Sequence, residues 1–140
     1  MLTSLEAIYT NYRQTLLEVR KKAKLFDGFF GLGKDPKKDP CHEAFYEAVG
    51  AWVADFVATE PSQGDIWTVS EFLVRHPLQY RDKECYWFMF AAHGHLKPLI
   101  PLMDKATSLA VHNCLETSYG KADRMPLQKE LLKTLKKNAK

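Results

Sequence analysis

Residues 4–24 read SLEAIYTNYRQTLLEVRKKAK, and they decide the first regular element of the chain. Their apolar side chains recur at steps of three and four residues, as on one face of an α-helix. These apolar positions are Leu5, Ile8, Tyr12, Leu16 and Val19. In front of them, Thr3 and Glu6 have the spacing of a capping box, in which each side chain satisfies a free amide of the other residue. The stretch therefore predicts an amphipathic helix from Ser4 to about Lys24.

A second helix is predicted to begin at Pro40. Asp39 can cap it, and proline suits the first helical position because its missing N–H would have no partner there. Its apolar residues are Phe45, Val49, Trp52 and Phe56, with Tyr46, Val53 and Val57 beside them. So wide an apolar face predicts burial on more than one side. We expect the helix to end before Pro61.

The segment from Phe26 to Pro40 is predicted to be a loop, because glycine and proline interrupt regular structure. Its breakers are Gly28, Gly31, Gly33, Pro36 and Pro40, and its apolar residues are Phe26, Phe29, Phe30 and Leu32. We interpret it as a packed loop that covers an edge of the core. The alternative is a protruding loop that binds a protein partner through Phe29 and Phe30. A phosphate-binding loop is excluded because the glycine spacing fails and Asp35 follows Lys34.

Two further helices are predicted in the middle of the chain. Thr68 and Glu71 have capping-box spacing and predict a short helix that stops before Pro77. Asp82 would cap a fourth helix that Gly94 ends. Its body, residues 85–92, is apolar all round, which is typical of a central helix but also compatible with a buried strand.

The last part of the chain predicts two more helices. Asp104 would cap the fifth, which closes near Gly120, and Pro126 would open the last. The last helix, about residues 125–138, is basic and amphipathic, which a peripheral position would suit. The expected fold is an all-α, single-domain bundle of five to six helices spanning residues 1–140.

The composition is that of an ordinary globular protein. The chain has 140 residues, of which 46% are hydrophobic and 26% charged, so it can bury a core without metals or disulfides. No apolar run approaches the roughly 20 residues of a membrane helix, and the first residues lack a secretory signal pattern. Three cysteines at irregular spacing argue against a disulfide framework. We therefore expect a cytoplasmic protein with no membrane association.

The stretch around Cys41 and His42 is the most site-like part of the sequence. If Asp39 caps the second helix, Cys41 lies in its first turn, where free amides favour a thiolate. His42 could act as its base, or both could bind a metal. Adjacent helical residues point about 100° apart, however, so they converge poorly. The alternative places Cys41 under the helix start and His42 at the surface.

His93 and His95 flank Gly94 at the predicted end of the fourth helix. Together with Cys41 and His42 they would supply four donors to zinc or iron. Their spacing matches no established zinc pattern, and no catalytic triad or metalloprotease motif is present. The sequence therefore predicts no resident cofactor, keeps a metal- or thiol-dependent site as an alternative, and favours a protein that is not an enzyme.

Basic charge is concentrated at the end of the chain. Residues 121–140 contain seven Lys or Arg against two Asp or Glu, a net charge of +5. Lys129, Lys133, Lys136 and Lys137 could contact phosphates, but no aromatic residue follows Tyr119 to stack on bases. An amphipathic helix with leucines inside and lysines outside accounts for the same pattern, so nucleic-acid binding ranks third.

The leading hypothesis is a non-enzymatic helical module that binds a protein partner or a small apolar ligand, with a homodimer as one form of partner. It follows from the absence of catalytic motifs, the aromatic residues near Phe29 and Phe30, and the apolar central helix.

Overall fold

The computed structural model describes residues 2–30, 40–79 and 89–140, with the backbone only for 19–30, 40 and 41. These residues form five α-helices with described bounds, a short helical stretch at residues 89–91 and four short 3-10 helices, and no strand occurs among them. The all-α prediction is confirmed. The contacts divide the chain into two compact units, Met1–Trp52 and Val53–Lys140.

Helix α1 (Leu2–Phe30) is longer than expected at both ends. It already includes Thr3 and Glu6, so the predicted capping box is wrong. It also continues past Lys24, so the prediction of a loop over residues 26–30 is wrong. One glycine in a helix costs only about 1 kcal/mol relative to alanine, and the apolar residues 25, 26, 29 and 30 keep the helical period. The rest of the predicted loop, residues 31–39, lies outside the described residues.

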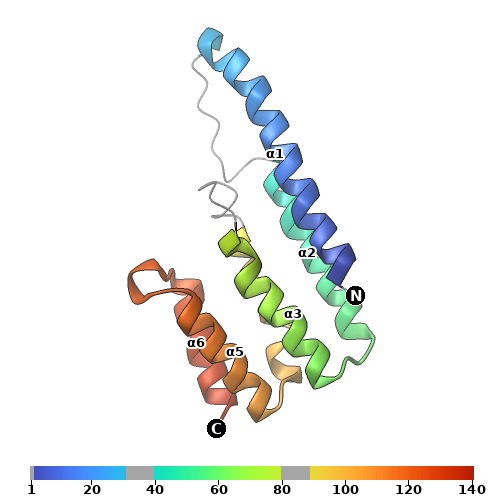
Figure 1. The fold of residues 1–140 in the computed structure, drawn as a ribbon, viewed down its shortest axis with the longest axis vertical. Helices are drawn as coiled ribbons and strands as arrows, with labels where there is room; N and C mark the ends of the chain where they lie inside the picture. The colour runs from blue at the N-terminus through green and yellow to red at the C-terminus, as the bar shows by residue number, and fades with distance from the viewer. Residues whose placement is uncertain (1, 31–39, 80–88) are drawn as a thin grey trace. The chain divides into compact units, whose positions relative to one another are not determined.

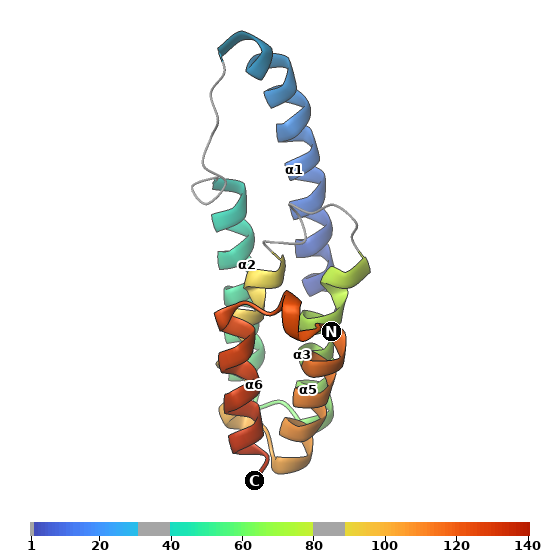
Figure 2. The ribbon, with the colours of Figure 1, turned by 90° about the vertical axis from the view of Figure 1, so that its left-hand side faces the viewer.

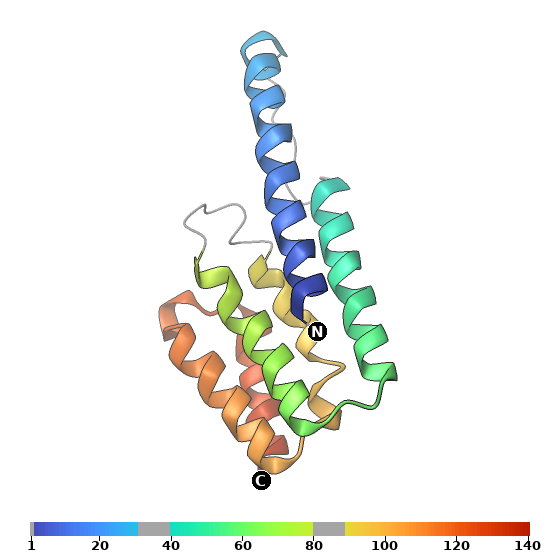
Figure 3. The same ribbon diagram turned by 45° about the vertical axis from the view of Figure 1, so that its right-hand side comes forward.

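Helix α2 (Pro40–Ala58) begins at Pro40 and ends before Pro61, as predicted. Within the first unit it packs against α1, with the two helices running in opposite directions (Figure 3). The ring of Phe45 contacts those of Tyr9 and Tyr12, with centroid separations of 5.0 and 4.3 Å. Further along the pair, the indole N–H of Trp52 donates to the hydroxyl of Ser4 at 2.8 Å. Aromatic packing and this hydrogen bond hold the pair in register.

The second unit begins its regular structure with α3 (Gln63–Arg75), which starts before the predicted Thr68 cap. The hydroxyl of Ser62 accepts a hydrogen bond from the amide of Asp65 at 3.2 Å and is the true cap. Thr68 lies inside the helix and donates to the carbonyl of Gly64 at 2.9 Å. The helix ends before Pro77, as predicted, and η2 (His76–Gln79) follows.

The described part of the predicted fourth helix is short. Residues 89–91 are helical, so the strand alternative is wrong for them, and residues 80–88 lie outside the described residues. The chain continues as η3 (Ala92–Leu96) and η4 (Ile100–Leu102). Gly94 therefore lies inside a 3-10 helix and does not terminate helical structure. Continuing the turn carries Leu96 into the core, where it is fully buried.

Helices α5 (Lys105–Ser118) and α6 (Pro126–Asn138) complete the second unit, with η5 (Lys121–Asp123) between them. The carboxylate of Asp104 accepts from the amide of Thr107 at 2.7 Å, which confirms the predicted cap of α5. The same N–H holds the pKa of Asp104 below its usual value. Helix α5 packs against both α3 and α6, and α6 also contacts η3 and η4 (Figures 1 and 2).

The core of the second unit consists largely of apolar side chains contributed by α3, η3, η4, α5 and α6. Its fully buried members include Val69, Leu73, Val74, Leu96, Leu99, Val111, Leu115 and Leu135. Of the helices in the described ranges, none combines the length and the apolar character needed to cross a bilayer.

Candidate functional site

His42 is buried in the contact between α1 and α2. Its Nδ1 atom lies 2.5 Å from the hydroxyl of Tyr12, and the two ring centroids are 5.6 Å apart. Only 6% of the residue is exposed, so the expectation of a surface histidine is wrong. The histidine ring can be buried there because the hydroxyl of Tyr12 provides a hydrogen-bond partner for its Nδ1 atom. The side chain of Cys41 lies outside the described residues, so its pairing with His42 stays a prediction.

His93 lies in η3 and is fully buried in the second unit. Its Nδ1 atom is 3.0 Å from the side-chain nitrogen of Gln128 on α6, and its Nε2 atom is 3.4 Å from the hydroxyl of Tyr119. Gln128 also donates to the carbonyl of Phe90 at 3.2 Å, and Tyr119 donates to the carbonyl of Val74 at 2.7 Å. Residues from α3, η3 and α6, together with the residue that ends α5, thus share one buried polar network.

The hydrogen-bond partners assign the protons of this network. A carbonyl only accepts, so the side-chain nitrogen of Gln128 must face Phe90. That nitrogen also faces His93, so Nδ1 accepts and the ring proton sits on Nε2. Burial lowers the pKa of His93 to about 4, against the opposing effect of the carbonyls of Val74 and Leu73. His93 is therefore neutral at pH 7, and its two ring nitrogens are both used inside the fold.

The four predicted metal donors are distributed over both units. His42 belongs to the first, whereas His93 and the half-buried His95 belong to the second. Among the side chains that the structure describes, no group of three or more His, Cys, Asp or Glu is placed to hold a metal ion. Because the Cys41 side chain is not among them, the four-donor metal site stays a prediction. The same holds for partner binding by Phe29 and Phe30, whose backbone is helical.

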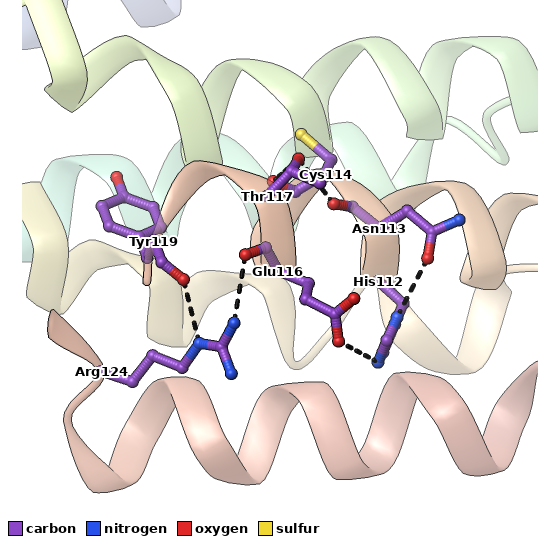
Figure 4. A network of polar contacts seen from close by, with 7 residues as sticks. All are labelled: His112, Asn113, Cys114, Glu116, Thr117, Tyr119 and Arg124. Atoms are coloured by element: carbon purple, nitrogen blue, oxygen red, sulfur yellow. Dashed lines mark hydrogen bonds and ion pairs between the residues drawn. The ribbon is translucent and has the colours of Figure 1, made fainter. Parts of the chain in front are cut away.

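Cys114 and His112 both lie on α5 (Figure 4). Cys114 is buried, and burial raises the pKa of its thiol although the charge of Arg75 opposes the shift. A thiol of this kind stays protonated and unreactive at neutral pH. His112 is half-buried, with Nε2 4.0 Å from the carboxylate of Glu116 and Nδ1 3.3 Å from the side chain of Asn113. Cys114 and His112 thus lie on different faces of α5, the first buried and the second partly exposed.

Arg124 closes the carboxyl end of the same helix (Figure 4). Its Nε donates to the carbonyl of Tyr119 at 3.0 Å, and one terminal nitrogen donates to the carbonyl of Glu116 at 3.1 Å. The last carbonyls of a helix have no partner within the helix, and a cation is favoured there by the helix dipole. Arg124 thereby fixes the turn that leads to α6.

A small cleft lies between the η3–η4 segment and α6. Its volume is about 190 Å³, and it is lined by Lys97, Ile100, Pro101, Glu130, Leu131 and Thr134. Lys97 and Glu130 form an ion pair at 3.9 Å, with both side chains more than half exposed. Exposed pairs of this kind contribute little to stability. Sequence reasoning missed the cleft because its two walls are some thirty residues apart in the chain, and nothing in the spacing pairs them.

The exposed face of α6 beside this cleft is basic. Lys129, Lys133, Lys136 and Lys137 are all exposed, and Glu130 is the acidic residue among them. Three of the lysines follow one another at steps of four and three residues, and Lys140 extends the row after the helix. Steps of this size place side chains on one face. The opposite face buries Gln128, Leu131, Leu132 and Leu135.

No protein family, curated protein or solved structure matches this chain. The class of this protein is therefore described by its all-α fold alone. The candidate binding surface consists of the cleft and the basic face of α6.

Proposed function

We propose that this protein is a non-enzymatic helical module that binds a protein partner. The cleft between η3–η4 and α6 carries this proposal. Its volume of about 190 Å³ is below the range of about 300–1,000 Å³ in which small-molecule pockets usually fall. It exceeds the cavity of about 150 Å³ that accommodates a benzene ring. A cleft of this size suits one apolar side chain of a partner better than a whole ligand.

The lining of the cleft supports the same choice. Ile100, Pro101 and Leu131 offer apolar walls, and Lys97 and Glu130 lie among the polar lining residues. An apolar pocket with a polar margin is the arrangement in which one anchor residue contributes most of the binding energy of a protein interface. Among the interpretations of the sequence, a protein partner therefore ranks above a small apolar ligand.

Site-specific photocrosslinking tests the proposal. A photoreactive amino acid in place of Thr134, at the cleft, should capture a protein in cells that naturally produce the chain. The matched control carries the same amino acid in place of Thr117, which is exposed on α5. Mass spectrometry would identify the crosslinked species, including a second copy of the chain. Equal capture from both positions, or a small molecule found at Thr134, would contradict a protein-binding cleft.

A further inference from the structure

The cleft is next to positive charge on both of its walls. Lys97 lies on the η3–η4 side, and Lys133 and Lys137 lie on α6 next to Glu130 and Thr134 in the helical period. All three lysines are exposed. Helix α6 contains four lysines and one glutamate, which give it a net charge of +3. A partner surface that covers this region must therefore bring negative charge or leave the lysines uncompensated.

We propose that the partner contributes an acidic segment whose single apolar side chain enters the cleft while its carboxylates pair with the lysines of α6. This inference rests on the proposed function and specifies the chemistry of the partner. The apolar side chain would contact Ile100, Pro101 and Leu131. The flanking carboxylates would lie beside Lys133 and Lys137, the lysines of α6 next to the cleft.

The spacing of the lysines beside the cleft fits such a segment. Lys133 and Lys137 are four residues apart, which corresponds to about 6 Å along a helix that rises about 1.5 Å per residue. Alternate side chains of an extended chain are about 6.6 Å apart, because each residue advances about 3.3 Å. An extended peptide with acidic residues two positions apart can therefore contact both lysines.

The ion pair between Lys97 and Glu130 in the cleft is weak enough for a carboxylate of the partner to replace Glu130. Lys97 and Glu130 are separated by 3.9 Å and are 54% and 66% exposed, so water screens their attraction. A carboxylate of the partner can take the place of Glu130 beside Lys97 at little cost. Nucleic acid would also satisfy the lysines, but phosphates give no role to the apolar walls of the cleft. The combination of an apolar cleft and adjacent lysines favours the acidic protein segment.

A peptide titration tests this inference directly. The probe is a short synthetic peptide in which glutamates alternate with serines around one phenylalanine, added to the isotope-labelled full chain and followed by NMR. We expect the amide signals of η3, η4 and α6 to shift. Replacing the phenylalanine by alanine should weaken binding at least about tenfold. Raising the salt concentration from about 50 to about 500 mM should weaken it further.

Two variants locate the binding site. Thr134→Phe fills the cleft from the exposed side of α6 and should weaken binding of the peptide about tenfold. Lys133→Glu should weaken it about fivefold, whereas Lys121→Glu, which reverses an exposed lysine outside α6, should have little effect. The NMR spectrum of each variant reports whether it folds.

Three results would overturn the inference. They are an absence of binding, equal effects of Lys133→Glu and Lys121→Glu, and binding that survives both Thr134→Phe and the loss of the phenylalanine. A short single-stranded oligonucleotide that binds α6 more tightly, without regard to Thr134→Phe, would assign the lysines to phosphates. If the peptide fails while photocrosslinking at Thr134 still captures a protein, the function stands and only the acidic chemistry is wrong. If both fail, the proposed function is wrong.

Discussion

The Nδ1 atom of His93 lies 3.0 Å from the side-chain nitrogen of Gln128, a contact that joins η3 to α6 inside the second unit. Because that nitrogen also donates to the carbonyl of Phe90, it cannot be replaced by the amide oxygen without placing two acceptors together. The histidine is consequently held in its neutral form. This relationship makes the stability of the second unit depend on pH.

We expect the free energy of unfolding to fall as the pH is lowered from about 6.5 towards 4. The pKa of His93 is about 4 in the folded protein and 6.5 in the unfolded chain, so in this interval only the unfolded state takes up the proton. The contribution is fully present above pH 6.5, and up to about 3 kcal/mol is lost by pH 4. Urea unfolding of the wild type and of His93→Gln at a series of pH values would measure it.

The slope of stability against pH is the quantity that decides this prediction. His93→Gln should flatten the slope between pH 4 and 6.5, even if the variant is less stable at every pH. Thr117→Gln, which alters an exposed residue of α5 without a titratable group, should leave the slope unchanged. A His93→Gln slope equal to that of the wild type would show that His93 is not the group responsible.

Replacing Gln128 with leucine should destabilise the protein by about 1–3 kcal/mol. The change leaves the carbonyl of Phe90 without the donor that Gln128 provides, and a buried polar group without its hydrogen bond costs about that amount. The exposed neighbour provides a control, because Lys129→Ala should change stability by less than about 0.5 kcal/mol. Thermal and urea unfolding would measure both, and equal effects would contradict a structural role for the network.

The cap of α3 can be identified by a matched pair of substitutions. Ser62→Ala should cost about 1 kcal/mol because it removes the acceptor of the Asp65 amide. Thr68→Ala should cost much less, since the threonine hydroxyl only bonds back to the carbonyl of Gly64 inside the helix. If urea unfolding shows a larger loss of stability for Thr68→Ala than for Ser62→Ala, Thr68 is the cap, as predicted from the sequence.

Arg124→Ala should lower the free energy of unfolding by about 1–2 kcal/mol. The guanidinium supplies two hydrogen bonds to the last carbonyls of α5, and bonds from a charged donor are stronger than neutral ones. Lys121→Ala removes a nearby exposed charge without such bonds and should be close to neutral. Hydrogen exchange at the end of α5 would reveal whether the loss is local.

The metal alternative makes its own prediction. If Cys41, His42, His93 and His95 form a site, protein purified without chelator should contain close to one zinc or iron per chain, and Cys41→Ser should lose it. Elemental mass spectrometry would measure the metal content. A content that is far below one per chain would exclude a tightly bound metal, and an unchanged content in Cys41→Ser would remove the cysteine from the site.

Helix positions were predictable wherever a local rule operates. Pro40 and Pro126 start helices because proline lacks the N–H that a first turn leaves unpaired, and Asp104 caps α5 through its own side chain. The sequence alone does not identify Ser62 as the cap of α3, because Thr68 and Glu71 have the complete spacing of a capping box. The extension of α1 to residue 30 is not evident from the sequence because Gly28 resembles a helix breaker, although the apolar residues around it keep the helical spacing.

The candidate surface was predictable only in part. The lysines of α6 follow from their spacing in the sequence, since Leu131 and Leu135 fix the buried face and leave the other face to solvent. The sequence spacing indicates that Gln128 is buried, because it stands three residues before Leu131 on the same face. Its polar side chain, however, is more typical of an exposed position. The contacts of η3 and η4 with α6 depend on tertiary packing, which no local pattern encodes.

The proton on Nε2 of His93 offers an internal spectroscopic reporter. An imidazole N–H usually exchanges with water too quickly to be observed, but this one is buried beside Tyr119 and the carbonyl of Val74. It should give a slowly exchanging NMR signal well separated from the backbone amides. Its rate of replacement by deuterium would follow the opening of the second unit without any added label.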